Sequence, residues 1–282
     1  QHLPTVVTIH DLIFMRYPQW YSYFDRKIHY KKFLYAAQNA QHIIAISEQT
    51  KRDIITYLGV PEEKITVVYQ GCHKAFKNTY TSEEKTAIRQ KYQLPERFVL
   101  NVGAIESRKN ALEIVKAIEP LEDMSLVLVG KPTQYYEEIK RYCESHNLSE
   151  RVQMLSGVSM EDLAIIYQLA TVFCYPSVFE GFGIPIIEAL FSKTPVITSK
   201  GSCFPEAGGA HSIYVNLDRA ATEIREAIVN ITTDEALRTT MITEGYHYAQ
   251  RFTDEAVFQE LMKVYEQVLG DRSQVSGVRA RL

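Results

Sequence analysis

Two glutamates separated by seven residues, Glu180 and Glu188, flank a glycine-bearing loop and are the first candidates for chemistry in this 282-residue chain. The stretch YPSVFEGFGIPIIEAL, 175–190, leaves a strand, crosses a Gly-Phe-Gly loop and enters a helix near Ile184 that begins with a proline. Backbone N–H groups from Gly181 onward and the positive end of the helix dipole would face an anion there. The segment therefore predicts a site for a phosphate or a sugar hydroxyl.

The two carboxylates are expected at different depths of that site. We place Glu188 in the first turn of the helix, where it can accept both hydroxyls of a nucleotide ribose, and Glu180 ahead of the helix. The alternative is that Glu188 only complements the helix dipole and Glu180 is a solvated loop residue. The preceding strand, the glycine loop and the proline-started helix together favour ligand binding.

A basic pair, Arg108 and Lys109, follows the strand in NVGAIESRKN (101–110) and precedes a helix expected at 110–118. Two cations at the carboxyl end of a strand can stabilise a diphosphate leaving group while the bond to a sugar breaks. A solvated pair in front of a helix is the alternative, and these residues alone leave the two interpretations even.

Regular alternation of strands and helices positions these residues. From residue 96 onward, Gly130, Lys131 and Val158 follow two central strands and would offer backbone groups to a base. Alternation of this kind is typical of a parallel, doubly wound sheet, whose ligands bind beyond the carboxyl ends of the strands. The expected strands are RFVLNVGA, SLVLVG, RVQMLSG, TVFCYPS, PVITSK and SIYVN.

Before that sheet lie three further strands, TVVTIHD, HIIAIS and KITVVYQG, with helices expected at 23–40 and 48–58. Ser47 is expected to cap the second helix. His10 ends the first strand, at the edge where a cleft between two domains would open. A histidine in an apolar strand is more often structural, but the position of His10 at this edge favours a catalytic role. Asp11 would either hold the imidazole or cap the loop.

The predicted organisation is α/β, with two Rossmann-like domains of which the first is incomplete. Residues 1–76 are a partial acceptor-side domain, 77–95 a linker and 96–251 the nucleotide-binding domain. Residues 252–270 form a helix that packs back toward the first domain, and 271–282 a mobile tail. Because 1–76 supply too few strands to close a sheet, we expect N-terminal sequence to be missing and this chain to show little or no transfer.

Composition narrows the classes of partner and compartment. A net charge of -3 gives no basic footprint for nucleic acid. Four scattered cysteines indicate neither a zinc site nor a disulfide framework, which favours the cytoplasm. No apolar run approaches the length of a membrane span. No Asp-x-Asp pair stands where a divalent ion would bridge a diphosphate, so we expect no metal and no cofactor.

An aromatic cluster lies between residues 17 and 24. We expect it to be partly core and partly interface, since tyrosine and tryptophan suit places where an apolar body needs a polar tip. Stacking on an acceptor and contact with a membrane surface are the alternatives. The cluster comprises Tyr17, Trp20, Tyr21, Tyr23 and Phe24.

Several motifs, in this order, resemble the retaining glycosyltransferases of GT-B fold in family 4, also called glycosyl transferases group 1. They are TIHDLIF, AISEQTKRDI, VVYQG, NVGAIESRKN, FEGFGIPIIEAL and FPEAGGA. The resemblance implies transfer of a sugar from a nucleotide-diphosphate sugar to a glycan or lipid-linked acceptor. It implies retention by front-face attack, with the leaving phosphate helping to deprotonate the acceptor.

The same resemblance assigns roles to single residues. It places Glu180 and His10 beside the donor sugar and Glu188 on the ribose, and it sets Glu206 near the donor pocket. Many members carry an arginine where this chain has Ala104, so we rank Lys109 ahead of Arg108 on the pyrophosphate. The remaining donor contacts implied are Gly103, Gly130, Lys131, Val158, Gly181, Phe182, Gly183 and Ile184.

The identity of donor and acceptor is less defined. The HDLIF and RKN forms resemble those of bacterial mannosyl- and rhamnosyltransferases of surface polysaccharide synthesis, which makes GDP-mannose one candidate donor. Such an enzyme would work in the cytoplasm, with peripheral contact at the inner face of the membrane as a further expectation. Two alternatives stay open: a non-catalytic nucleotide-sugar-binding module or fragment, and a GT-B nucleotide-sugar epimerase.

Overall fold

The computed structural model describes residues 4–279, with side chains through residue 270, and divides them into two compact units. Unit 1 contains the residues up to Gly71, the short segment Glu180–Phe182 and the residues from Arg251 onward. Unit 2 contains Cys72–Phe179 and Gly183–Gln250. Each unit has its own parallel sheet.

Within the described residues, unit 2 is built on a six-stranded sheet in the order β6-β5-β4-β7-β8-β9. All neighbouring strands are parallel, as the sequence predicts. The order reverses between β4 and β7, which is where a doubly wound sheet binds its ligands. The strands are β4 Phe98–Val102, β5 Ser125–Val129, β6 Val152–Leu155, β7 Val172–Tyr175, β8 Val196–Ser199 and β9 Ile213–Val215.

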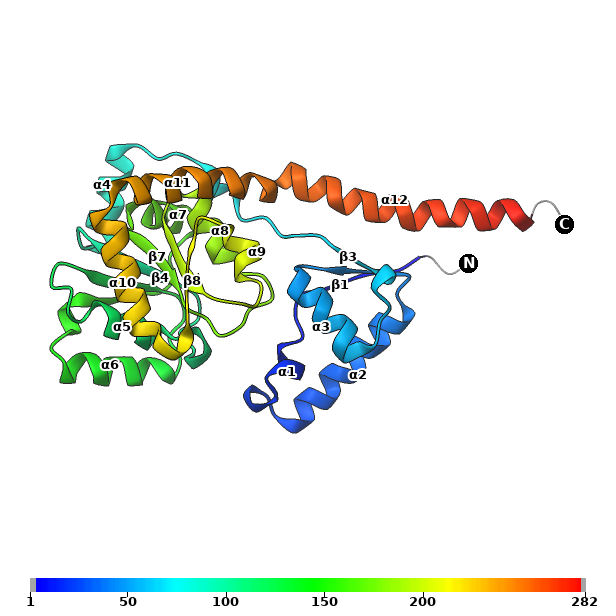
Figure 1. Ribbon diagram of the computed structural model, residues 1–282, viewed down its shortest axis with the longest axis horizontal. Coiled ribbons are helices and arrows are strands. Elements are labelled where there is room, and N and C mark those ends of the chain that lie inside the picture. The colour runs from blue at the N-terminus through cyan, green and yellow to red at the C-terminus, as the bar shows by residue number, and fades with distance from the viewer. Residues whose placement is uncertain (1–3, 280–282) are drawn as a thin grey trace. The chain divides into compact units, whose positions relative to one another are not determined.

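Helices cover both faces of this sheet (Figure 1). Alternate strand residues such as Val99, Leu126 and Cys174 pack with α5, α6 and α10 in one core. On the opposite face, Phe173 of β7 packs against Tyr167 of α7 with ring centroids 5.2 Å apart. The helices are α4 Ser82–Tyr92, α5 Ala111–Ile118, α6 Tyr135–Ser145, α7 Met160–Leu169, α8 Ile184–Phe191, α9 Phe204–Gly208, α10 Ala220–Thr233 and α11 Glu235–Ala249.

The segment 77–95, for which a linker is predicted, lies inside unit 2. Its helix α4 starts with a capping box between Thr81 and Glu84, which satisfies free N–H groups at both positions. Lys91 and Tyr92 at its end both donate to the Asp162 carboxylate of α7 at 2.6 Å. These bonds and the packing of α4 on α7 attach the segment to the second sheet.

Unit 1 holds a three-stranded parallel sheet in the described residues, in the order β1-β2-β3. Ile43 and Ala45 of β2 belong to a core shared with α2 and α3, while Ile44 packs with residues of the helix α12. Gly59 ends α3 in the left-handed conformation, with φ of 64°. The elements are β1 Val6–Ile9, α1 Ile13–Arg16, α2 Tyr23–Asn39, β2 His42–Ala45, α3 Glu48–Leu58, β3 Ile65–Val67 and α12 Asp254–Arg279.

Helix α12 returns to the sheet of unit 1. Val257, Leu261 and Val264 pack on the face that carries Ile44 and Val68. The helix is longer than predicted, because the backbone of 271–279, expected as a mobile tail, continues it. The last part of that tail, 280–282, lies outside the described residues. In the described part of the chain, no helix has the length and apolar character to cross a membrane.

Candidate donor-binding site

Lys109 is held at the point where the strand order of unit 2 reverses. It ends a short 3-10 helix, Ser107–Lys109, that follows β4. A Cβ built on Gly103 would come 2.5 Å from Lys109 Nζ, so the ammonium lies directly against the backbone beyond β4. Nζ also stands 5.5 Å from the ring centroid of Tyr175, the last residue of β7. A cation is thus placed between the ends of the two strands at the reversal.

Gly103 and Gly130 bring the ends of β4 and β5 into close contact. A Cβ on Gly130 would lie 2.0 Å from the Gly103 carbonyl oxygen, so only glycine fits there. Of the other residues predicted at this edge, Lys131 is exposed just after β5, and Val158 is half-buried after β6. The structure therefore brings Gly103, Lys109 and Gly130 together, with the other two at the same sheet edge.

Arg108 is engaged in holding the loop that follows β7. Its Nε donates to Glu106 Oε2 at 2.8 Å, and its Nη1 donates to the Phe179 carbonyl at 3.1 Å. Its own carbonyl accepts from the Val178 N–H at 2.8 Å. The guanidinium thus has a carboxylate and a carbonyl as partners, and Arg108 has a structural role in this loop.

Glu188 is a buried carboxylate on α8. The helix begins at Ile184, as predicted, but the prediction that Glu188 lies in its first turn is wrong, because Glu188 is the fifth residue. Only 9% of Glu188 is exposed, and Tyr167 Oη donates to Glu188 Oε2 at 3.0 Å. Burial raises the pKa of Glu188 to about 7, although the bond from Tyr167 acts in the opposite direction. Simple complementation of the helix dipole does not explain a carboxylate in this position.

Tyr167 is a residue that sequence reasoning missed. It is fully buried on α7, and its hydroxyl also lies 3.2 Å from the Pro185 carbonyl oxygen of α8. A tyrosine in the apolar run LAIIYQLA was the available signal, since a buried phenol requires a polar partner. That partner, Glu188, is remote in sequence and could not be identified from the run itself.

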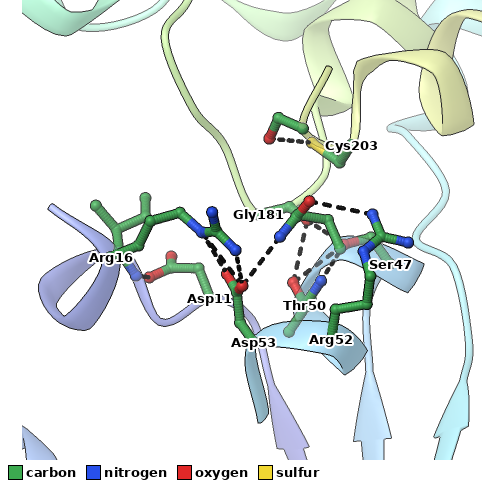
Figure 2. A network of polar contacts seen from close by, with 11 residues as sticks. Asp11, Arg16, Ser47, Thr50, Arg52, Asp53, Gly181 and Cys203 are labelled. Carbon is green, nitrogen blue, oxygen red and sulfur yellow. Dashed lines mark hydrogen bonds and ion pairs between the residues drawn. The ribbon is translucent and has the colours of Figure 1, made fainter. Parts of the chain in front are cut away.

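Gly181 of the Gly-Phe-Gly loop is bound within unit 1. Its carbonyl accepts from Ser47 Oγ at 2.7 Å, and a Cβ on Gly181 would lie 2.4 Å from the His10 carbonyl oxygen (Figure 2). Ser47 also accepts from the Thr50 N–H at 3.0 Å, which confirms it as the cap of α3. One hydroxyl therefore starts a helix and fixes the loop, and the close approach to His10 requires glycine.

Phe182, the middle residue of the loop, has its side chain in the core of unit 1. Only 2% of Phe182 is exposed. Its ring stacks on Tyr69 with centroids 5.3 Å apart and meets Phe252 edge-on at 5.5 Å. The predicted donor contact of Phe182 is therefore restricted to its backbone groups.

His10 and Asp11, at the end of β1, have different roles. His10 is exposed, and its Nδ1 lies 3.5 Å from Gln70 Nε2. Asp11 Oδ1 accepts from the Ile13 N–H at 3.1 Å, so Asp11 caps the loop into α1. His10 and Glu180 belong to unit 1, whereas Lys109 and Glu188 belong to unit 2.

Glu206, which was predicted near the donor pocket, lies in α9 of unit 2. Its backbone carbonyl accepts from Tyr248 Oη at 2.7 Å.

The cysteines and acidic residues do not form ligand sets. All four cysteines are buried, and burial raises the pKa of Cys143 and of Cys174. Among the described residues, no three His, Cys, Asp or Glu side chains gather as a metal-binding group.

Comparison with known proteins decides the family. The model of the family described as Glycosyl transferases group 1 matches residues 84–248, more than half of the chain, and that described as Glycosyltransferase Family 4 matches residues 1–75. The chain belongs to the glycosyl transferases group 1 family. The motifs that suggested this family, including FEGFGIPIIEAL, lie within the matched segments.

Among glycosyl transferases of this group, two O-antigen enzymes are similar to the chain. O-antigen chain mannosyltransferase RfbU of Salmonella typhimurium is 31% identical over 75% of this chain, which spans 56% of that protein. O-antigen chain mannosyltransferase B of Escherichia coli is 26% identical over 93% of this chain and 70% of its own length. The structure of Anabaena HepE with UDP and glucose aligns with a TM-score of 0.80 at 20% identity, over 94% of this chain and 71% of HepE. The last comparison establishes the GT-B fold.

In this member of the family, an ion pair connects the segment after β1 to α3 (Figure 2). Both carboxylate oxygens of Asp53, which is 1% exposed, accept from Arg16 Nε at 3.2 Å. Gln49 Nε2 donates to Asp53 Oδ1 at 2.9 Å, and Arg52 in turn donates to Gln49 Oε1 at 3.1 Å. The side chain of Arg16 is about one third exposed, with 35% accessible.

Arg16→Ala should therefore lower the free energy of unfolding. The substitution leaves the buried carboxylate of Asp53 without its main charge partner, and we expect a loss of about 2 kcal/mol, below the range for fully buried pairs because Arg16 reaches solvent. Chemical denaturation measures this change in the free energy of unfolding. Adding Asp53→Asn to Arg16→Ala should recover part of the loss, since no charge then remains buried. A double variant as unstable as the sum of the singles would contradict this explanation.

Proposed function

We propose that this protein is a retaining, metal-independent glycosyltransferase that moves a sugar from a nucleotide-diphosphate sugar to a glycan or lipid-linked acceptor. The observation that carries the proposal is the pair of charges in unit 2. Lys109 Nζ lies against Gly103 at the reversal of the strand order, and the carboxylate of Glu188 lies buried in α8, which begins beyond β7. Such a pair suits the two ends of a nucleoside diphosphate.

The proposed mechanism uses positioning and charge. Lys109 binds the pyrophosphate and stabilises the negative charge that grows on it as the glycosidic bond breaks. Glu188 accepts the ribose hydroxyls, which fixes the nucleotide. The acceptor hydroxyl attacks from the face that the leaving phosphate occupies, and a phosphate oxygen takes its proton. Arg108 contributes by holding the loop at Phe179, while His10 and Glu180 orient the sugar.

Mannose is the sugar that we propose, and GDP-mannose the donor. The support is that two similar proteins are named as O-antigen mannosyltransferases. Anabaena HepE, which shares the fold, was solved with UDP and glucose, so the base is the point to test. Calorimetric titration of the chain with GDP, UDP and ADP, each in EDTA, should show the tightest binding for GDP. Loss of binding in EDTA would contradict the metal-free mechanism.

Glu180 should affect the sugar and its transition state, and not the nucleotide. In the complete gene product, Glu180→Gln should lower kcat/KM while the affinity for the bare nucleotide changes little. Steady-state rates and calorimetry measure the two quantities. The matched control is Glu150→Gln, a change of the same kind at an exposed residue after α6, which should alter neither. Weaker binding of the bare nucleotide to the Glu180 variant would contradict the proposal that Glu180 acts on the sugar and Glu188 on the nucleotide.

We propose the cytoplasm as the site of action, with peripheral contact at the inner face of the membrane. The support is chemical, because all four cysteines are buried thiols, as in proteins of a reducing compartment. A lipid-linked acceptor would be presented at that face. Fractionation of cells that express the complete gene product checks this, and the expected result is a pool on membranes that high salt releases.

A further inference from the structure

The outer face of α2 carries large apolar side chains in contact with solvent. Phe24, Ile28 and Tyr35 follow the spacing i, i+4 and i+11, which places them on one stripe of the helix. All three are exposed, Phe24 to 75%. The opposite face, with Phe33 and Ala37, packs into the core of unit 1. The helix is therefore apolar on two opposite faces, and only one of them contributes to the core of its own unit.

Lysines border this exposed stripe. Lys31 lies within it at position i+7, and Lys27 and Lys32 flank it on either side; all three are exposed. The one acidic residue of the helix, Asp25, accepts from Ser22 Oγ at 2.7 Å at its start. Because the whole chain has a net charge of -3, this concentration of positive charge is local. We call Phe24, Ile28, Tyr35 and the three lysines the α2 face.

A cavity of about 310 Å3 adjoins the α2 face at the start of the helix. It contains two cations of α2, Arg26 and Lys27, together with aromatic rings. Lys27 Nζ stands 4.7 Å from the ring centroid of Tyr23. The lining residues are Met15, Tyr23, Arg26, Lys27, Tyr30 and Tyr57. The cavity thus offers positive charge and apolar surface to one group that reaches it from the α2 face.

We propose that the α2 face binds the surface of an anionic lipid bilayer, with Phe24, Ile28 and Tyr35 inserted among the headgroups and the lysines on lipid phosphates. An amphipathic surface with aromatic and aliphatic side chains between lysines is what an interfacial helix presents to anionic lipid. The tyrosine ring suits the interface, because it joins an apolar body to a polar hydroxyl. The cavity then receives one headgroup phosphate beside Arg26 and Lys27. The inference depends on the proposed function only in expecting a membrane-borne acceptor.

Flotation with lipid vesicles tests the inference. The chain should float with vesicles that contain phosphatidylglycerol and should stay behind with vesicles of phosphatidylcholine alone. Two variants should each weaken binding about tenfold or more: Phe24→Ala with Ile28→Ala and Tyr35→Ala, and Lys27→Gln with Lys31→Gln and Lys32→Gln. High salt should release the wild type, because exposed charges are screened.

Matched control variants distinguish binding through the α2 face from nonspecific binding to vesicles. Phe258→Ala removes another exposed ring, 60% accessible on α12, and a triple Gln variant of the exposed Lys74, Lys193 and Lys263 removes the same charge elsewhere. Both should float like the wild type, and the nucleotide affinity of every variant should stay unchanged. The inference is overturned if the α2 variants bind vesicles as well as the wild type does, or if the wild type does not float. It is also overturned if the chain binds no vesicles but forms a concentration-dependent dimer that the triple variant with Phe24→Ala abolishes.

Discussion

Glu188→Gln should make the nucleotide-free protein more stable and, at the same time, a poorer nucleotide binder. Burial raises the pKa of Glu188 from its ordinary 4.5 to about 7 in the folded chain. Between these two values the folded state holds a proton that the unfolded state has lost, so stability falls as pH rises through this window. The amide of Gln carries no charge to bury, and Tyr167 can still donate to its oxygen. At pH 8 we expect a gain on the order of 2 to 3 kcal/mol.

The same substitution should remove the ionised acceptor for the ribose hydroxyls. Loss of hydrogen bonds to a charged group costs about 1.5 to 3 kcal/mol, so GDP and the GDP-sugar should both bind roughly tenfold to hundredfold more weakly at pH 8. In the wild type, nucleotide affinity should fall as pH drops below about 7, where Glu188 takes up a proton. The Gln variant should lack this pH dependence. Calorimetry from pH 6 to pH 8.5 and denaturation at the same values give both quantities.

Tyr167→Phe is the control for the geometry of Glu188. It removes the hydroxyl that donates to Glu188 Oε2 but keeps the ring that packs on Phe173 and Phe76. Because this bond favours the ionised carboxylate, its loss should move the pH dependence of nucleotide affinity to higher pH. An unchanged pH profile in the Tyr167 variant, or a Glu188→Gln variant that keeps its affinity for GDP, would show that Glu188 does not bind the ribose.

The sequence predicted what depends on local pattern. The strands of unit 2 are short apolar runs bounded by glycine, proline or charge, and all six appear where the pattern puts them. The start of α8 at Ile184 and the cap at Ser47 follow from proline and serine chemistry at helix ends. The Gly-Phe-Gly loop could be recognised for the same reason, because the strand before it and the helix start after it are each defined by a few neighbouring residues.

Contacts between distant segments could not be predicted in this way. The burial of Glu188 depends on Tyr167 of another helix, which no local pattern identifies. Its place beyond the first turn of α8, in contrast, follows from the predicted start at Ile184, so that prediction was a miscount along the helix. The partner of Arg108 at Phe179 lies 71 residues away, which is why a basic pair looked equally suited to solvent and to phosphate. The α2 face is another case. The aromatic cluster at its start was predicted as partly core and partly interface, and only the packing of α2 shows that Phe24 and Tyr35 are exposed.

Lys109→Ala should abolish most of the affinity for the diphosphate part of the donor. The ammonium lies between the ends of β4 and β7, against Gly103, where a pyrophosphate would contact it directly. Loss of one charge-assisted hydrogen bond to phosphate costs about 1.5 to 3 kcal/mol, so GDP should bind roughly tenfold or more weakly. The effect should be smaller for GMP, which lacks the second phosphate. Titration of both nucleotides into the wild type and the variant measures the difference.

Two further variants decide whether charge at this position is the cause. Lys109→Met keeps the length of the side chain but removes the ammonium, and it should lose as much GDP affinity as Lys109→Ala. Lys116→Ala removes a lysine of α5 whose Nζ lies 2.7 Å from Glu113 Oε1, and it should leave GDP binding intact. Since only the Lys109 variants lose a contact with phosphate, the gap between them and the wild type should narrow at high salt. Equal GDP affinity in the Lys109→Met variant and the wild type would show that Lys109 does not bind the pyrophosphate, and Arg108 would then be the candidate for that contact.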